Sequence, residues 1–187
     1  MSMCSTQRGI APTVPSVIFR AAEYQAGRVV LMSNRKPLPK VAYAPMLGLE
    51  AFVRARVNKD YSHLVQLRAS ALNQCVYCLA MHRRDARKDG WSKERIAHVE
   101  DWTEHREAFS DTEIAALELT DAVTRINGEE SVPDQLWNRV ETLHGEKDAR
   151  NLLMAIVTIN AWNRIGITTR LDPGSLSGVD AFDLGEA

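Results

Sequence analysis

The sequence predicts one all-α domain, a helical bundle. Apolar residues recur at helical spacing between residues 45 and 170, residues that favour helix ends separate these stretches, and none of them shows the alternation of a β-strand. The chain has 187 residues, which suits a single domain with a sizeable core. Its 45% hydrophobic and 25% charged residues are typical of an ordinary globular protein.

The two ends of the chain lack a sustained apolar period. Residues 1–40 contain four prolines and predict an N-terminal arm, in which residues 17–32 form a short helix and Cys4 is a free thiol. Residues 171–187 contain three glycines and four acidic residues, and predict a loosely held C-terminal tail. The helical domain is therefore expected over residues 41–170.

Three helices are predicted in the first half of this domain. The first two are core helices, because apolar residues recur there with a helical period. Their apolar stripes are Met46, Leu49, Phe52 and Val53, followed by Leu64, Leu67, Ala71 and Leu72. The third has Asn73 as its N-cap and runs to about Asp89, where Gly90 ends it. Cys75 then lies in its first turn.

Capping residues define the helices of the second half. Ser92 caps the fourth helix, and Ser110 with Glu113 forms a capping box at the fifth. The inward-facing residues of these two helices are predicted to be Ile96, Val99 and Trp102, followed by Ala115, Leu119, Ala122 and Ile126. Pro133 begins the sixth helix and Gly145 ends it, and the last helix spans residues 147–170.

Charge and hydropathy exclude several functions. The chain has 23 Lys and Arg against 24 Asp and Glu, so no overall field favours nucleic acid or an anionic membrane. No apolar run approaches the ~18 residues of a membrane-spanning helix. The first residues lack the apolar region of a secretory signal. We therefore expect a cytoplasmic protein with no nucleic-acid or membrane partner.

A C-x-x-C motif followed by a histidine carries the chemistry. On a helix, Cys75, Cys78 and His82 fall within a sector of about 60°. The two sulfurs can close a small disulfide, which allows reversible two-electron oxidation. The helix N-terminus favours the thiolate, and by itself points to Cys75 as the more acidic thiol. His82 is the natural proton acceptor for the Cys78 thiol.

Other interpretations of these residues remain open. The two cysteines could be small buried apolar residues. Cys75, Cys78, His82 and His63 could also provide the four ligands of a zinc site. Covalent haem is excluded, because it needs a histidine directly after Cys78 and Leu79 stands there. We expect no cofactor.

The segment around the motif resembles a known family. LVQLRASALNQCVYCLAMHRRDARKDGWS is similar to the signature of the carboxymuconolactone decarboxylase superfamily, in its alkylhydroperoxidase D (AhpD) branch. The segments FSDTEIAALELTDAVTRI, VPDQLW and INAWNRIGITTR resemble the helices that follow it. The resemblance covers residues 41–170. It implies an all-helical subunit that assembles into a homo-oligomer, a trimer or a hexamer.

The resemblance also implies roles for individual residues. In the family the second cysteine attacks the peroxide and the first resolves it, so Cys78 would be peroxidatic and Cys75 resolving. The family's proton relay includes a glutamate where this chain has His63, and some members have a histidine where it has Tyr77. His63 can relay protons, but it does not supply a fixed negative charge beside His82.

The function expected from the sequence is a thiol-dependent peroxidase. Cys75 and Cys78 would reduce a hydroperoxide, and a dithiol donor, either a lipoylated or a thioredoxin-like protein, would restore both thiols. Two alternatives remain. One is a decarboxylase-type lyase of the wider superfamily, against which the dithiol argues because proton chemistry at carbon needs no dithiol. The other is a non-catalytic redox sensor.

Overall fold

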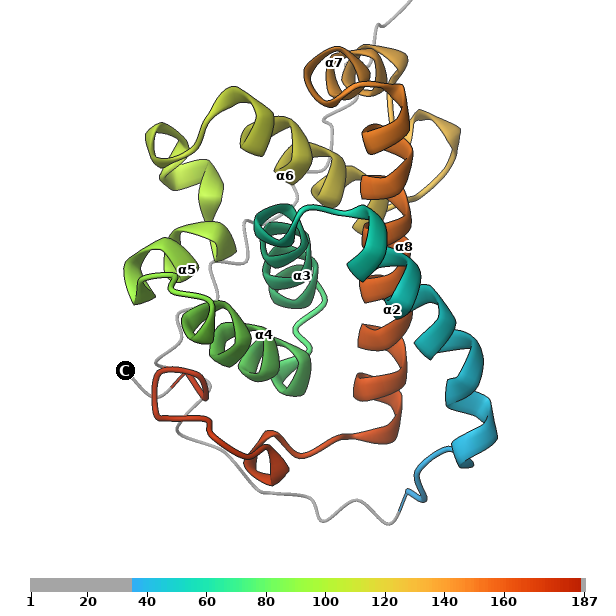
Figure 1. Ribbon diagram of the computed structural model, residues 1–187, viewed down its shortest axis with the longest axis vertical. Coiled ribbons are helices and arrows are strands. Elements are labelled where there is room, and N and C mark those ends of the chain that lie inside the picture. Colours follow the sequence, from blue (N-terminus) through green and yellow to red (C-terminus); the bar gives the residue numbers. More distant parts are fainter. Residues whose placement is uncertain (1–34, 186–187) are drawn as a thin grey trace, which may run out of the picture. The chain divides into compact units, whose positions relative to one another are not determined.

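The computed structural model describes residues 35–185, and this part of the chain is built from α-helices with no β-strand (Figure 1). The predicted fold class, a single all-α domain, is confirmed. The helices are α2 (Ala44–Arg56), α3 (Lys59–Leu72), α4 (Val76–Lys88), α5 (Lys93–Glu100), α6 (Asp111–Thr124), α7 (Asp134–His144) and α8 (Glu146–Thr169). Cys4 and the helix predicted over residues 17–32 lie outside the described residues.

Helix α3 is the centre of the domain and packs against α4, α5, α6 and α8 (Figure 1). One of its faces contributes Val65 and Ala69 to a core shared with α6, α7 and α8, while the other contributes Leu64 and Leu67 to a core with α5 and α6. Full burial of a leucine or isoleucine side chain stabilises a fold by about 1.5–3 kcal/mol. Because α3 takes part in both cores, its residues are held firmly.

The local signals for helix starts act as the sequence predicts at two helices. The Ser92 side chain accepts a hydrogen bond from the backbone N–H of Arg95 at the start of α5. Ser110 and Glu113 form the reciprocal capping box at the start of α6. Pro133 lies one residue before α7, as its N-cap. Gly145 separates α7 from α8 with a φ of 83°, a backbone conformation that favours glycine.

Two predictions about apolar stripes are wrong. Helix α2 is not a core helix within residues 35–185, because Val53 is its only buried residue and Phe52, which belongs to the same predicted stripe, is 39% exposed. It packs chiefly against α8, so only one side of it is covered. Ile126 is 63% exposed because α6 ends at Thr124, before the last position of its predicted stripe.

The C-terminal segment is also held more firmly than expected. Asp183 is 1% exposed, and its carboxylate accepts hydrogen bonds from Arg87 on α4 at 2.9 and 2.5 Å. Arg83 of α4 donates to the backbone carbonyls of Phe182 and Asp183. Cationic side chains of α4 thus bind a segment 96 to 100 residues further along the chain, a pairing that no local pattern predicts.

The longest helix, α8, has 24 residues. Neither it nor any other helix in residues 35–185 is both long enough and apolar enough to cross a membrane.

Candidate functional site

The two cysteines lie where the chain turns from α3 into α4. Gln74, between the two helices, has a φ of 56°, in the left-handed region that few residues other than glycine adopt. The backbone N–H of Cys75 then donates to the carbonyl of Ser70 at 3.0 Å, which ties the turn to α3. Cys75 is the N-cap of α4 and Cys78 is its third residue.

The prediction that Asn73 caps α4 is therefore wrong, since Asn73 is the C-cap of α3. Its side chain is used in tertiary structure instead. The amide Nδ2 donates to the Oδ1 atoms of Asn160 and Asn163 on α8, both at 2.9 Å. Asn163 in turn donates to the hydroxyl of Ser70 at 3.1 Å. This buried polar network ties the turn between α3 and α4 to α8.

Cys75 and Cys78 form a disulfide, with their Cα atoms 5.3 Å apart. The first backbone N–H groups of a helix have no intrahelical acceptor, so the N-terminus of α4 presents positive potential to its surroundings. Both sulfurs belong to this helix start. The helix terminus consequently favours a thiolate at either cysteine, and no longer singles out Cys75.

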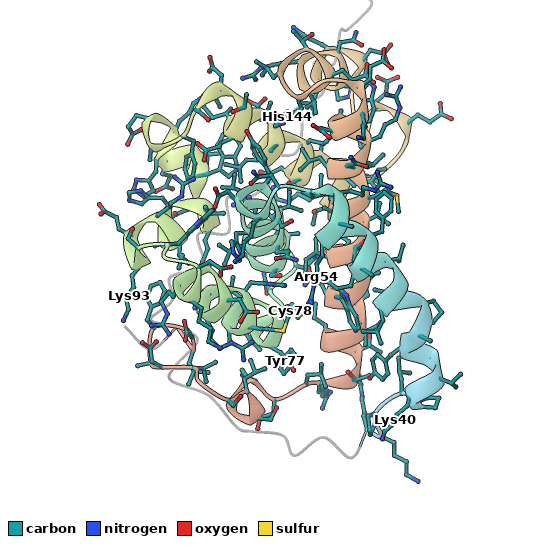
Figure 2. The ribbon with its side chains drawn as sticks, viewed as in Figure 1. Lys40, Arg54, Tyr77, Cys78, Lys93 and His144 are labelled. Atoms are coloured by element: carbon teal, nitrogen blue, oxygen red, sulfur yellow. A yellow bond between two sulfur atoms is a disulfide. The ribbon has the colours of Figure 1, made fainter. Side chains whose placement is uncertain are left out.

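Helix α8 covers the disulfide through a glycine. A Cβ atom at Gly166 would lie 3.2 Å from the Sγ atoms of both Cys75 and Cys78, closer than ordinary van der Waals contact. In Figure 2 the labelled Cys78 lies at the end of α4 that faces α8. Together with the surrounding packing, this approach leaves Cys75 2% and Cys78 3% exposed.

Replacing Gly166 by alanine is expected to destabilise the oxidised protein by about 1–2 kcal/mol, because overpacking at the two sulfurs outweighs the higher helix propensity of alanine. Urea unfolding of the oxidised protein measures the change. Gly48→Ala is the matched control, since Gly48 also lies within a helix and has nothing within 4 Å of its Cβ position. This control should be neutral or stabilising by up to about 1 kcal/mol. Equal stability of the two variants would contradict the close approach of α8.

His82 lies one turn after Cys78 on α4 and is buried, with 6% of its surface exposed. Its Nε2 atom has no hydrogen-bond partner within residues 35–185. Burial, and after it the neighbouring His63 and Arg84, lowers the pKa of His82 to about 3. At pH 7 only about one molecule in 10⁴ would carry the charged ring. In this disulfide form His82 is thus a neutral imidazole.

His63 lies on α3 and is also buried. Its Nε2 atom is 2.7 Å from Oδ2 of Asp89, the C-cap residue of α4, and Lys59 bonds the other carboxylate oxygen. The sequence did not point to Asp89 as a site residue. It lies 26 residues from His63, and the residues around it indicate only that a helix ends there. Asp89 thus places a carboxylate beside His63, on the side of the ring that carries Nε2.

The four residues named from the sequence thus lie on two packed helices. Cys75, Cys78 and His82 share the α4 segment, and His63 on α3 lies close enough to His82 to affect its pKa. Within residues 35–185 no group of three or more His, Cys, Asp and Glu side chains is arranged to hold a metal ion. The zinc interpretation of these four residues is therefore not supported in this oxidised form.

Comparison with known proteins gives the family. Residues 40–122 match the carboxymuconolactone decarboxylase family. An uncharacterized protein, YdfG, from Bacillus subtilis (strain 168) is 37% identical over 123 residues, which are 65% of this chain and 82% of that protein. The chain belongs to the carboxymuconolactone decarboxylase family. The resemblance stated from the sequence is confirmed.

A solved structure supports the same assignment at the level of fold. It is a protein of unknown function from Agrobacterium tumefaciens, described as a candidate antioxidant defence protein, AhpD. The two chains are 32% identical with a TM-score of 0.65, over 70% of this chain and 89% of the other. The part matched to the carboxymuconolactone decarboxylase family contains Cys75, Cys78, His63, His82 and Asp89, whereas Gly166 lies beyond it.

Proposed function

We propose that this chain is a thiol-dependent peroxidase in which Cys75 and Cys78 reduce hydroperoxides with the help of His82. One observation carries the proposal: two cysteines that can bond to each other lie at the start of a helix, one turn from a buried neutral imidazole. A dithiol supplies two electrons, the helix start favours the thiolate, and the imidazole accepts its proton.

The proposed cycle balances in three steps. The Cys78 thiolate attacks one oxygen of the hydroperoxide, the O–O bond breaks, and the departing alkoxide takes up the thiol proton to form an alcohol. Cys78 is then a sulfenic acid. Cys75 attacks its sulfur, releases water and forms the disulfide. A dithiol donor reduces the disulfide and is itself oxidised to a disulfide; a lipoylated or a thioredoxin-like protein has the required chemistry.

Mass spectrometry of the cysteines tests this cycle. The reduced protein is mixed with a small excess of cumene hydroperoxide, quenched at intervals, and analysed as intact protein and as peptides. We expect rapid loss of two hydrogens, mapped to a Cys75–Cys78 bridge. In Cys75→Ser, a sulfenic acid should be trapped on Cys78, whereas Cys78→Ser should not react on this timescale. The proposal is wrong if both thiols of the wild-type protein stay reduced for hours.

A redox sensor is the second candidate, and the burial of both sulfurs favours it, because a large reductant has no direct access to a disulfide that is 2–3% exposed. Repeated turnover separates the two functions. With excess cumene hydroperoxide and either dihydrolipoamide or a reduced thioredoxin as the donor, a peroxidase consumes many equivalents of peroxide. A sensor is oxidised once and stops.

A further inference from the structure

In the hydrogen bond between Asp89 and His63, the donor and the acceptor can be identified. The Asp89 carboxylate lies at hydrogen-bond distance from two side chains of α3, Lys59 and His63. The hydrogen bond from Lys59, and after it that from His63, hold the pKa of the Asp89 carboxyl below its usual value. An ionised carboxylate only accepts hydrogen bonds. The Nε2 atom of His63 must therefore carry the hydrogen of this bond.

That direction leaves the other ring nitrogen of His63 without a partner. When Nε2 of a neutral imidazole carries the hydrogen, Nδ1 presents a lone pair. Nδ1 of His63 is buried and has no hydrogen-bond partner in the part of the chain that the structure describes, and the same holds for Nε2 of His82. A buried polar atom without a partner costs about 1–3 kcal/mol, so two of them on packed helices need an explanation.

A contact with an aromatic ring also restrains the ring of His63. Trp91 contacts it edge-on, with ring centroids 5.4 Å apart. The indole N–H of Trp91 donates to Asp60 at 3.0 Å, and the Arg95 guanidinium lies 4.4 Å from the indole centroid. Trp91 is thus fixed in turn, which restricts rotation of the His63 ring about its side-chain bonds.

We propose that Asp89 is a positioning residue for the thiol chemistry: it holds the Nε2–H of His63, so that Nδ1 is available as a proton acceptor beside His82. The proton that leaves the Cys78 thiol can then be shared between the two imidazoles before the departing alkoxide takes it up. Nothing is oxidised or reduced in this transfer. The role of Asp89 in proton transfer rests on the proposed peroxidase function. Its hydrogen bond to His63 is independent of that function.

The first test reads the tautomer of His63 without any turnover. Side-chain ¹⁵N shifts of ¹⁵N-histidine-labelled, oxidised protein distinguish the Nε2–H form from the Nδ1–H form. We expect the Nε2–H form in the wild-type protein and a mixture in Asp89→Asn, because a neutral amide accepts more weakly than a carboxylate. Asp85→Asn is the matched control, since Asp85 also lies on α4 but bonds Arg84. An unchanged tautomer in Asp89→Asn overturns the proposal.

The second test uses the rate of disulfide formation after mixing the reduced variants with cumene hydroperoxide. Asp89→Asn should be slowed by about 10-fold or more, Asp89→Glu should recover much of the rate, and Asp85→Asn should match the wild-type protein. If the tautomer of Asp89→Asn changes and its rate does not, the role in proton transfer is wrong. A wild-type protein that is inert to peroxide instead refutes the peroxidase function, while the ¹⁵N shifts still decide whether Asp89 holds His63.

Discussion

Replacing His82 by glutamine is expected to slow the oxidation of the reduced cysteine pair by cumene hydroperoxide by about 10²- to 10⁴-fold at pH 7, the usual contribution of a general acid–base group. Glutamine keeps a polar group near the position of Nε2 but cannot take a proton from the Cys78 thiol. Rapid-quench mass analysis of disulfide formation measures the rate. The loss should shrink near pH 9.5, because hydroxide then ionises a thiol without a neighbouring base.

The low pKa of His82, about 3, does not oppose this role. It belongs to the disulfide form, in which neither sulfur can carry a charge. In the reduced protein a thiolate at Cys78 favours the charged imidazole, since an opposite charge within ~4–6 Å raises the pKa of a histidine. Proton transfer from Cys78 to His82 therefore becomes more favourable once the disulfide is opened.

The control for this variant is His98→Gln. His98 lies on α5 and stacks on His105, with ring centroids 4.0 Å apart, so its replacement should leave the oxidation rate unchanged. Circular dichroism verifies that both variants fold. A folded His82→Gln protein that reacts within about threefold of the wild-type rate would contradict the assignment of His82 as the proton acceptor.

Local signals in the sequence predict most of the helices and the three site residues Cys75, Cys78 and His82. The start of α5 at Ser92 and of α6 at Ser110 depends on hydrogen bonds within three residues, so the sequence around each position determines it. The motif of Cys75, Cys78 and His82 is local in the same way, because one helix turn relates each residue to the next.

The remaining features depend on contacts between distant residues. Asn73 has the chemistry of an N-cap, yet two asparagines of α8, 87 and 90 residues further along the chain, determine what its side chain does. Gly166 is recognisable as a site residue only once α8 lies against the disulfide. The helical period and the caps predict neither the distance between α8 and the cysteines nor the pairing of Asp89 with His63.

The largest effect on stability is expected from Arg68, a buried cation between three helices. Its side chain on α3 is 9% exposed and binds both carboxylate oxygens of Asp121 on α6, at 2.6 and 2.7 Å. It also donates to the backbone carbonyl of Glu100, the last residue of α5. Replacing Arg68 by methionine fills much of the volume but leaves the Asp121 carboxylate without its countercharge.

We expect Arg68→Met to lower the free energy of unfolding by about 2–4 kcal/mol, at the lower end of the usual range for breaking a buried pair because the Asp121 side chain is 22% exposed. Urea unfolding of the oxidised protein measures it. Arg54→Met is the matched control, because Arg54 pairs with Glu50 within α2 while its side chain is 78% exposed. That change should cost less than about 1 kcal/mol.

A double variant distinguishes loss of the ion pair from loss of packing. In Arg68→Met with Asp121→Leu no charge remains buried, so the double variant should be more stable than Arg68→Met alone, although it lacks one more native side chain. If the double variant is instead less stable by a further 2 kcal/mol or so, the hydrogen bond from Trp102 to Asp121 and the packing around it matter more than the charge. The contacts of Asp121 would then stabilise the fold through their geometry rather than through compensation of its charge.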